Sequence, residues 1–216
     1  MRLYFQKNKQ YQSLLYAIYG KFGLNLKKLI KMAKTPSNMV PIGFDAPSFE
    51  LYDTISKKIL KSKNIFGKKC TFLMFICNHC PFVVHVNKEI VKMANEYQKK
   101  GVSFIAISSN DVINYPEDSP KKMNEIALKE KYTFPYLYDE TQQVAKDYDA
   151  ACTPDFYVFD ENNKLVYRGQ LDDSRPGNDI PVSGNYIRNV FDCLLSSKEI
   201  NIKQKPSIGC NIKWIN

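Results

Sequence analysis

Two apolar runs of strand length, separated by one helix-length stretch, constrain the fold of this chain more than any other feature. Residues 71–76 and 102–107 are almost entirely apolar, as expected for strands that are buried on both faces of a sheet. Between them, Pro81 suits the first turn of a helix and Gly101 suits a helix C-terminus. A strand, a helix and a second strand in this order predict a parallel β-α-β unit.

Shorter segments complete the expected order of elements. The runs 156–159 and 164–168 flank a turn-forming sequence and predict a β-hairpin. An antiparallel hairpin beside parallel strands indicates an α/β fold with a mixed central β-sheet flanked by helices. Further strands are expected over 48–52, 58–60 and 134–138, and further helices over 119–131, 141–148 and 182–196.

Positive charge is concentrated near the N-terminus. The chain of 216 residues has a net charge of +9, from 31 Lys and Arg against 22 Asp and Glu. Residues 1–44 contain eight of these cations and no Asp or Glu, so the remainder has a net charge of +1. Because a nucleic-acid-binding domain needs a basic face on the folded domain itself, no nucleic-acid partner is expected.

The basic segment is expected to be an N-terminal extension over 1–34, before a domain over 35–205 and a C-terminal tail over 206–216. Its apolar residues at helical spacing beside lysines indicate either a flexible amphipathic tail or an organelle-targeting peptide. No apolar run approaches the roughly 20 residues of a membrane span, so no transmembrane segment is expected. Six cysteines without a secretory signal indicate a reducing compartment. The expected location is cytoplasmic, or an organelle matrix if residues 1–31 are a targeting peptide.

The sequence Cys77-Asn78-His79-Cys80 lies between the first buried strand and the helix that follows it. The positive end of a helix dipole stabilises a thiolate near the helix N-terminus, and His79 adds to this effect when it is protonated or donates a hydrogen bond. Cysteines three positions apart are close enough to form a disulfide. We therefore expect Cys77 to attack a substrate disulfide and Cys80 to resolve the mixed disulfide.

Two other interpretations of the cysteine pair are small buried residues of the core and a metal site. A structural zinc site needs four ligands, and the sequence has no second cysteine pair of this spacing. His79, His85, Cys152 and Cys210 complete a site only if the fold brings them together. No metal or other cofactor is therefore expected.

Thr153-Pro154 is a second candidate element of a site. A proline directly before a strand cannot donate to the sheet ladder, and a cis peptide bond turns the chain sharply. Together with the strand, cysteine pair and helix, this position predicts a cis bond that exposes the backbone of Thr153.

The motifs together resemble those of a known family. The similar segments are 75–83, 152–156, 167–176 and 206–214. They resemble the thioredoxin-like redoxin proteins related to the alkyl hydroperoxide reductase/thiol-specific antioxidant group, over residues 35–216. The resemblance implies a thioredoxin-like fold in which Thr153 and Pro154 face the cysteine pair and bind the substrate backbone. It also implies that Cys152 lies near the dithiol, and we expect Asn78 to contact the substrate.

The sequence departs from thioredoxin at two positions that bear on the chemistry. Thr71 stands where thioredoxin has a buried carboxylate, which leaves the proton acceptor unassigned. A histidine before the second cysteine favours a stabilised thiolate, so we expect an active site less reducing than that of thioredoxin.

Peroxidase activity is an alternative because the resemblance includes peroxiredoxins. These proteins carry a proline and a hydroxyl residue at set positions before the reactive cysteine, and the same positions before Cys77 hold Cys70 and Met74. Arg168 and Arg175 are the candidate contacts for a peroxide.

The sequence therefore predicts an enzyme, a thiol–disulfide oxidoreductase with Cys77, Cys80 and His79 as catalytic residues. The expected partners are a protein or small-molecule disulfide and a thiol reductant such as thioredoxin or glutathione. Cys152 and Cys210 are candidate third redox thiols. A peroxiredoxin-type antioxidant peroxidase and a metal-binding thioredoxin-like module are the alternative functions.

Overall fold

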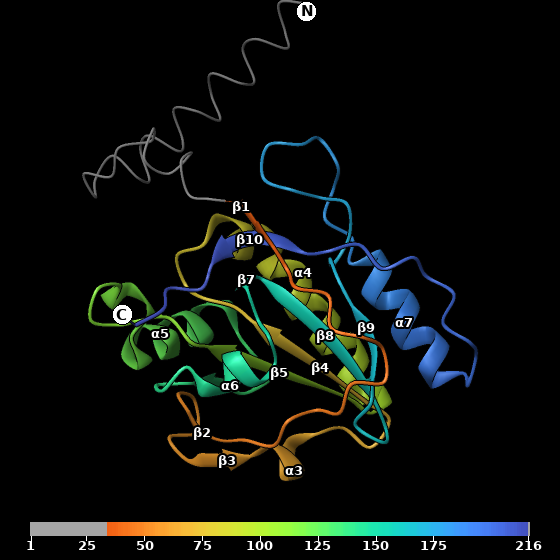
Figure 1. Cartoon of the computed structure of the whole chain (residues 1–216), viewed down its shortest axis with the longest axis horizontal. Helices are drawn as coiled ribbons and strands as arrows, with labels where there is room; N and C mark the ends of the chain where they lie inside the picture. Colours follow the sequence, from red (N-terminus) through yellow and green to blue (C-terminus); the bar gives the residue numbers. More distant parts are fainter. Residues whose placement is uncertain (1–33, 216) are drawn as a thin grey trace, which may run out of the picture. The chain divides into compact units, whose positions relative to one another are not determined.

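A mixed sheet of seven strands crosses the domain (Figure 1). The computed structural model describes residues 34–215, so the expectations for the segment before residue 34 lie outside the described residues. Within this range, no helix combines the length and apolar character that a membrane span requires. In spatial order the strands are β3 (Ile59–Lys61), β2 (Glu50–Asp53), β6 (Tyr136–Tyr138), β5 (Val102–Ser108), β4 (Cys70–Phe75), β8 (Asp155–Asp160) and β9 (Leu165–Arg168).

The central β-α-β unit forms as the apolar runs predict. β4 and β5 pair in parallel, as do β5 and β6, and the other pairs in this sheet are antiparallel. Helix α4 (Pro81–Tyr97) and the short 3-10 helix η2 (Gln98–Lys100) connect β4 to β5. Gly101 ends this connection with a φ of +93°, which glycine adopts without a steric cost. The predicted α/β class with a mixed central sheet is confirmed.

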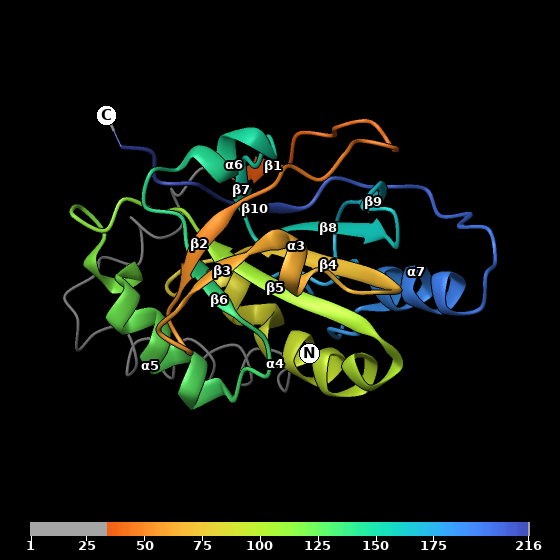
Figure 2. The same ribbon diagram turned by 90° about the horizontal axis from the view of Figure 1, so that it is seen from below.

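Side chains alternate along β4 and fill both faces of the sheet. The ring centroid of Phe72 lies 5.4–5.6 Å from those of Phe104, Phe156 and Phe191. Because Phe191 is on α7 (Asn185–Leu195), this aromatic cluster attaches α7 to one face. Leu73 and Phe75 point to the opposite face and pack in the cluster that contains α6 (Gln143–Asp147). Figure 2 shows α4 and α7 on one side of the sheet and α6 on the other. The remaining helices are α3 (Ser62–Ile65), η3 (Pro116–Asp118) and α5 (Pro120–Glu130).

A second, three-stranded sheet was not predicted. It consists of β1 (Lys34–Pro36), β10 (Ile208–Asn211) and β7 (Cys152–Thr153), all antiparallel. Residues 206–216, expected to be a tail, therefore include a strand of the domain. The strands are short and come from three distant parts of the chain, so no local pattern marks them.

Two helices begin later than expected because distant carboxylates cap them. The N–H of Ala145 in α6 donates to Asp139 at 2.9 Å. Before α7, the backbone N–H groups of Ser183 and Gly184 both donate to Asp172 at 2.7 Å. Carboxylates that accept N–H groups at a helix N-terminus stabilise its first turn, and here each carboxylate comes from outside the helix.

Candidate active site

The cysteine pair lies where β4 passes into α4. The N–H of Ile76 still donates to a carbonyl of the neighbouring strand at 2.9 Å, which holds the chain in the sheet up to the pair. Pro81 occupies the first helical position, where a missing N–H costs no helical hydrogen bond, so Cys80 is the N-cap residue. Cys77 and Cys80 are both buried, with 2% and 0% of their surface exposed.

The peptide bond between Thr153 and Pro154 is cis, as the sequence predicts. This loop faces the cysteine pair. The hydroxyl of Thr153 lies 3.3 Å from the sulfur of Cys77, and its carbonyl oxygen lies 3.0 Å from the sulfur of Cys80. The expected exposure of the Thr153 backbone is not found, because Thr153 is 3% exposed and pairs with Cys210 of β10.

Helix α4 stabilises negative charge on Cys80 rather than on Cys77. Burial alone would raise the pKa of Cys80, but hydrogen bonds from the thiols of Cys210 and Cys77 and from the N–H groups of Val83 and Cys210 outweigh burial and lower it. The pKa of Cys77 is raised by its hydrogen bond with Cys80, by burial and by the charge of Asp118. The expected acidic thiol was Cys77; the structure differs because Cys77 is buried beside the charge of Asp118 and hydrogen-bonded to Cys80, whereas Cys80 is stabilised by the neighbouring thiols and by the N–H of Val83.

Asp118 is a buried carboxylate beside the pair that sequence analysis did not single out. Its side chain accepts the backbone N–H of Asn78 at 2.8 Å and the amide of Asn110 at 2.7 Å. Oδ2 also lies 2.8 Å from Nδ1 of His79. Burial lowers the pKa of His79, but the contact with Asp118 and its charge outweigh burial and raise it. Asp118 and His79 are therefore in direct contact beside the cysteine pair, and they are the candidates for the proton acceptor that Thr71 left unassigned.

The sequence carries only a weak signal for this carboxylate. Asp118 is one of three acidic residues in the turn-rich stretch 110–118, and nothing in their spacing separates it from Asp111 or Glu117. The parallel pairing of β4 and β5 is what brings the loop after β5 next to the loop after β4.

The side chain of Asn78 holds the turn between the cysteines in place. Its amide donates to the carbonyl of Glu117 at 2.7 Å, and its side-chain oxygen accepts the hydroxyl of Tyr136 at 3.1 Å. These bonds connect the turn to η3 and β6. A contact of Asn78 with substrate stays a prediction.

Cys77, His79 and Asp118 offer ligand atoms within 4.8 Å of one another, which makes them a candidate metal group. The carboxylate of Asp118 already accepts two N–H donors and contacts His79, so a metal ion would have to replace these interactions. His85, also considered as a ligand, bonds instead to Ser174 at 2.7 Å.

The other cysteines differ in their relation to the pair. The sulfur of Cys210 lies 2.9 Å from that of Cys80. Cys152 is fully buried, its thiol donates to the carbonyl of Pro154 at 3.6 Å, and burial raises its pKa. Burial also raises the pKa of Cys70, to about 12. Cys193 is on α7, where its sulfur contacts Asn189. Among the candidate third thiols, Cys210 is the one in contact with the pair.

Neither arginine considered as a peroxide contact takes up that position. Arg168 is fully buried, and its guanidinium donates to Asp155 at 3.0 Å and to the carbonyl of Asp149 at 2.8 Å. Arg175 donates to the carbonyls of Asp172 and Ser174 at 2.7 and 2.6 Å, as a turn residue does. Both guanidinium groups are therefore engaged by the protein itself.

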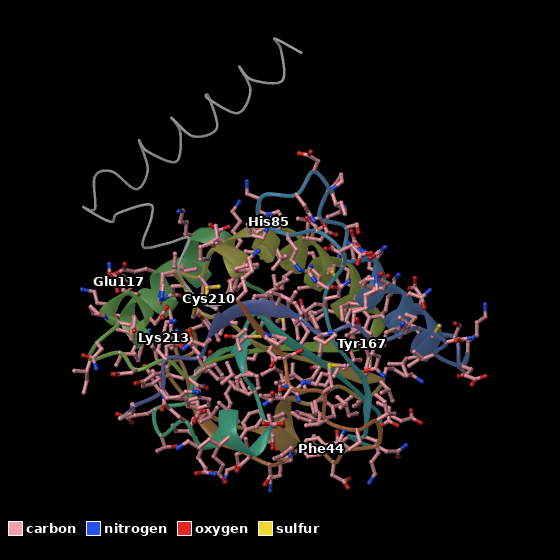
Figure 3. All side chains as sticks on the ribbon, turned by 45° about the horizontal axis from the view of Figure 1, so that its top comes forward. Phe44, His85, Glu117, Tyr167, Cys210 and Lys213 are labelled. Atoms are coloured by element: carbon pink, nitrogen blue, oxygen red, sulfur yellow. The ribbon has the colours of Figure 1, made fainter. Side chains whose placement is uncertain are left out.

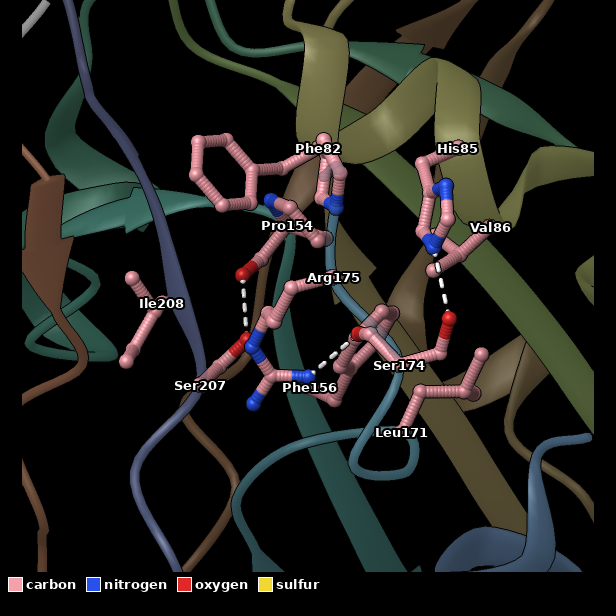
Figure 4. Close-up of a pocket in the computed structure, with 11 residues that line it drawn as sticks. Phe82, His85, Val86, Pro154, Phe156, Leu171, Ser174, Arg175, Ser207 and Ile208 are labelled. Atoms are coloured by element: carbon pink, nitrogen blue, oxygen red, sulfur yellow. Dashed lines mark hydrogen bonds between the residues drawn. The ribbon is translucent and has the colours of Figure 1, made fainter. Parts of the chain in front are cut away.

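A small pocket lies beside the cis proline (Figure 4). Pro154 and Phe82 line it together with residues of the segment around Arg175. Ser207, just before β10, donates its hydroxyl to the carbonyl of Pro154 at 2.7 Å. This bond attaches the C-terminal segment to the proline loop at a second point beside the β7–β10 pairing.

Comparison with known proteins identifies the family. Residues 42–168 match the model of the AhpC/TSA family. The chain belongs to this family. A conserved, uncharacterized protein from Geobacillus kaustophilus has a similar crystal structure, with 57% identity and a TM-score of 0.84 over 85% of this chain and 97% of that one. A hypothetical protein from Sinorhizobium meliloti 1021 has 41% identity and a TM-score of 0.82 over 84% of this chain and 99% of that one.

The fold is also similar to that of more distant proteins. One is a peroxidoxin from Mycobacterium tuberculosis, with 16% identity and a TM-score of 0.55 over 74% of this chain and 99% of that one. At this identity the similarity shows the fold alone, which is thioredoxin-like. Among curated proteins, no significant match was found. The family and the fold confirm the resemblance found in the sequence and support a thioredoxin-like redox function.

Proposed function

We propose that this AhpC/TSA family protein is a thiol–disulfide oxidoreductase with Cys77 and Cys80 as its redox pair. The observation that carries the proposal is the contact of both sulfurs with Thr153, directly before the cis proline. This arrangement combines a dithiol, a helix N-terminus that stabilises a thiolate and a candidate acid–base pair formed by the half-buried His79 and the buried Asp118.

The proposed reaction transfers two electrons from the dithiol to a substrate disulfide. Cys77 passes its proton to Cys80, to which it is hydrogen-bonded, and its thiolate attacks one substrate sulfur. A mixed disulfide forms and one substrate thiolate leaves, with a proton supplied by His79. The sulfur of Cys80 then attacks the sulfur of Cys77, the bond between Cys77 and the substrate breaks, and the second substrate thiolate takes up the proton lost by Cys80, which leaves a Cys77–Cys80 disulfide. A thiol reductant restores the dithiol.

Strand β10 influences which substrates are accepted. Because β10 is already paired with Thr153, the backbone edge expected to bind a substrate peptide is occupied. Cys77 is also only 2% exposed. Both features favour a small-molecule disulfide over an extended protein segment.

A thiol peroxidase is the second candidate function. The family assignment and the hydroxyl of Thr153, 3.3 Å from the sulfur of Cys77, favour it. Against it, Arg168 and Arg175 are engaged elsewhere, so neither guanidinium is available to hold a peroxide at the pair.

The test compares the wild-type chain with Cys77→Ser and Cys80→Ser, using Cys193→Ser as a matched control on α7. Reduction of insulin and of oxidised glutathione is followed with dithiothreitol as the electron source. We expect reduction of oxidised glutathione to exceed reduction of insulin, Cys77→Ser to abolish both, and Cys80→Ser to accumulate a mixed disulfide. Cys193→Ser keeps the wild-type rate.

Unchanged rates in both Cys77→Ser and Cys80→Ser would contradict the proposal. Consumption of hydrogen peroxide with the same reductant, without reduction of either disulfide, would assign the peroxidase function instead. Stoichiometric zinc or copper binding that is lost on alkylation of Cys77 and Cys80, again without disulfide reduction, would assign a metal-binding module.

A further inference from the structure

Three of the chain's six cysteines meet at one point of the fold. The sulfur of Cys80 is hydrogen-bonded to Cys77 and lies 2.9 Å from the sulfur of Cys210, which is 130 positions away in the sequence. A disulfide bond is about 2.05 Å long, so the sulfurs of Cys80 and Cys210 need to approach by less than about 1 Å to form one. Cys80 therefore has two cysteines within reach.

We propose that Cys210 is a third redox thiol, which exchanges with Cys77 as the disulfide partner of Cys80. The inference rests on the proposed function of the Cys77–Cys80 pair and extends it. It gives the oxidised protein two forms, one with a Cys77–Cys80 bond and one with a Cys80–Cys210 bond.

The backbone around Cys210 holds its sulfur at the pair. Figure 3 labels Cys210 on β10. Cys210 pairs with Thr153 of β7 on one side and with Lys34 of β1 on the other. Gly209 brings the two strands close, since a Cβ atom there would lie 2.0 Å from the carbonyl oxygen of Thr153. With the bond from Ser207 to Pro154, these contacts attach β10 to the proline loop over its whole length.

This placement also explains the occupied edge of the proline loop. β10 lies where a substrate segment was expected to pair with Thr153, and it presents a cysteine to the dithiol as a bound substrate would. The segment 207–211 is thus an internal partner of the redox pair. Cys152, the other candidate third thiol, directs its sulfur to the carbonyl of Pro154 at 3.6 Å, whereas the sulfur of Cys210 contacts that of Cys80 directly.

The exchange step balances without an external reagent. The thiolate of Cys210 attacks the sulfur of Cys80 in the Cys77–Cys80 disulfide. The bond between Cys80 and Cys210 forms, the bond between Cys77 and Cys80 breaks, and Cys77 leaves as a thiolate that takes up the proton lost by Cys210. No electrons are gained or lost overall, and the step frees Cys77.

While Cys77 and Cys80 are reduced, Cys210 stays protonated and is a poor nucleophile. Its hydrogen bond to Cys80, burial and the charge of the Cys80 thiolate raise the pKa of Cys210. Once Cys80 is in a disulfide it carries no charge, so both effects of Cys80 disappear. Lys213, which favours the Cys210 thiolate, remains. Cys210 therefore becomes a better nucleophile after the pair is oxidised.

The test maps disulfides in the full chain. Wild type, Cys77→Ser, Cys210→Ser and the control Cys193→Ser are oxidised with diamide, quenched in acid, alkylated with N-ethylmaleimide and digested without reduction for mass spectrometry. We expect Cys80–Cys210 peptides beside Cys77–Cys80 peptides in wild type and Cys193→Ser, and Cys80–Cys210 peptides alone in Cys77→Ser. Cys210→Ser forms only the Cys77–Cys80 bond.

The inference is overturned if neither wild type nor Cys77→Ser yields a Cys80–Cys210 peptide. That result leaves the proposed function standing if the wild-type chain still reduces disulfides and forms a Cys77–Cys80 bond. Loss of disulfide reduction in wild type is instead a failure of the proposed function, whichever peptides are found. Cys210→Ala serves as a second variant if Cys210→Ser does not fold.

Discussion

Replacing Gly209 by Ala tests whether the close approach of β10 to the proline loop matters. The added Cβ would lie 2.0 Å from the carbonyl oxygen of Thr153, 2.5 Å from its carbonyl carbon and 3.0 Å from the nitrogen of Pro154. Ordinary van der Waals contacts begin near 3.4 Å, so the strands have to separate by more than 1 Å. All three contacts are with backbone atoms, which cannot move aside as a flexible side chain can.

Two measurable effects follow from this separation. Overpacking of this kind costs about 1–3 kcal/mol of unfolding free energy, which corresponds to a drop in melting temperature of roughly 2–12 °C for a protein of this size. The same displacement moves Cys210 away from Cys80, because Cys210 is the next residue on the strand. We therefore expect Gly209→Ala to lose most of the Cys80–Cys210 peptide while it keeps the Cys77–Cys80 peptide.

Asn211→Ala is the matched control, since its exposed side chain lies on the same strand. Chemical denaturation and disulfide mapping are performed on both variants. Asn211→Ala should stay within about 0.5 kcal/mol of wild type and keep both peptides. If Gly209→Ala matches Asn211→Ala in stability and in Cys80–Cys210 yield, the steric argument is refuted.

The remaining predictions concern the acid–base pair and the core. Asp118→Asn removes the charge that raises the pKa values of His79 and Cys77, so both pKa values should fall. NMR titration measures the pKa of His79, and alkylation with iodoacetamide across pH measures that of Cys77. Unchanged pKa values would contradict the assignment. The raised pKa of His79 means that the folded state binds its proton more tightly than the unfolded state. Its contribution to stability is therefore complete below about pH 6.5 and is lost as the pH rises through its folded pKa, and His79→Asn should flatten this part of the stability profile. Phe191→Ala should lower the free energy of unfolding by about 3–5 kcal/mol in denaturant titrations, because Phe191 is fully buried. The control Val84→Ala, on the exposed face of α4, should change it by no more than about 0.5 kcal/mol. Equal losses in the two variants would show that the aromatic cluster does not anchor α7.

Local patterns in the sequence were sufficient to predict the central sheet and to single out the cysteine pair. The apolar runs at 71–76 and 102–107 correspond to β4 and β5, because a strand covered on both faces has to be apolar throughout. The cysteine pair and the following helix were predicted from neighbouring residues, and the cis bond before Pro154 was predicted from its own position combined with that strand, cysteine pair and helix; the structure has both the helix and the cis bond.

The tertiary structure decided which thiol is stabilised. The four residues from Cys77 to Cys80 do not show whether the helix includes both cysteines or begins after them. In the structure Cys80 caps α4, so the free N–H groups of the first turn act on Cys80. The thiols of Cys210 and Cys77 lower the pKa of Cys80 further, and Cys210 comes from a distant strand.

The sequence by itself determined the α/β class, the β-α-β core, the cysteine pair and the cis proline, because each shows in a local pattern or in the order of such patterns along the chain. Only the tertiary structure decided that Asp118 lies beside His79, that Arg168 is paired inside the core, and that Cys210 reaches Cys80. These contacts join residues 13 to 130 positions apart. They form when strands pair across the sheets, and strand pairing depends on the packing of the whole domain rather than on any local pattern.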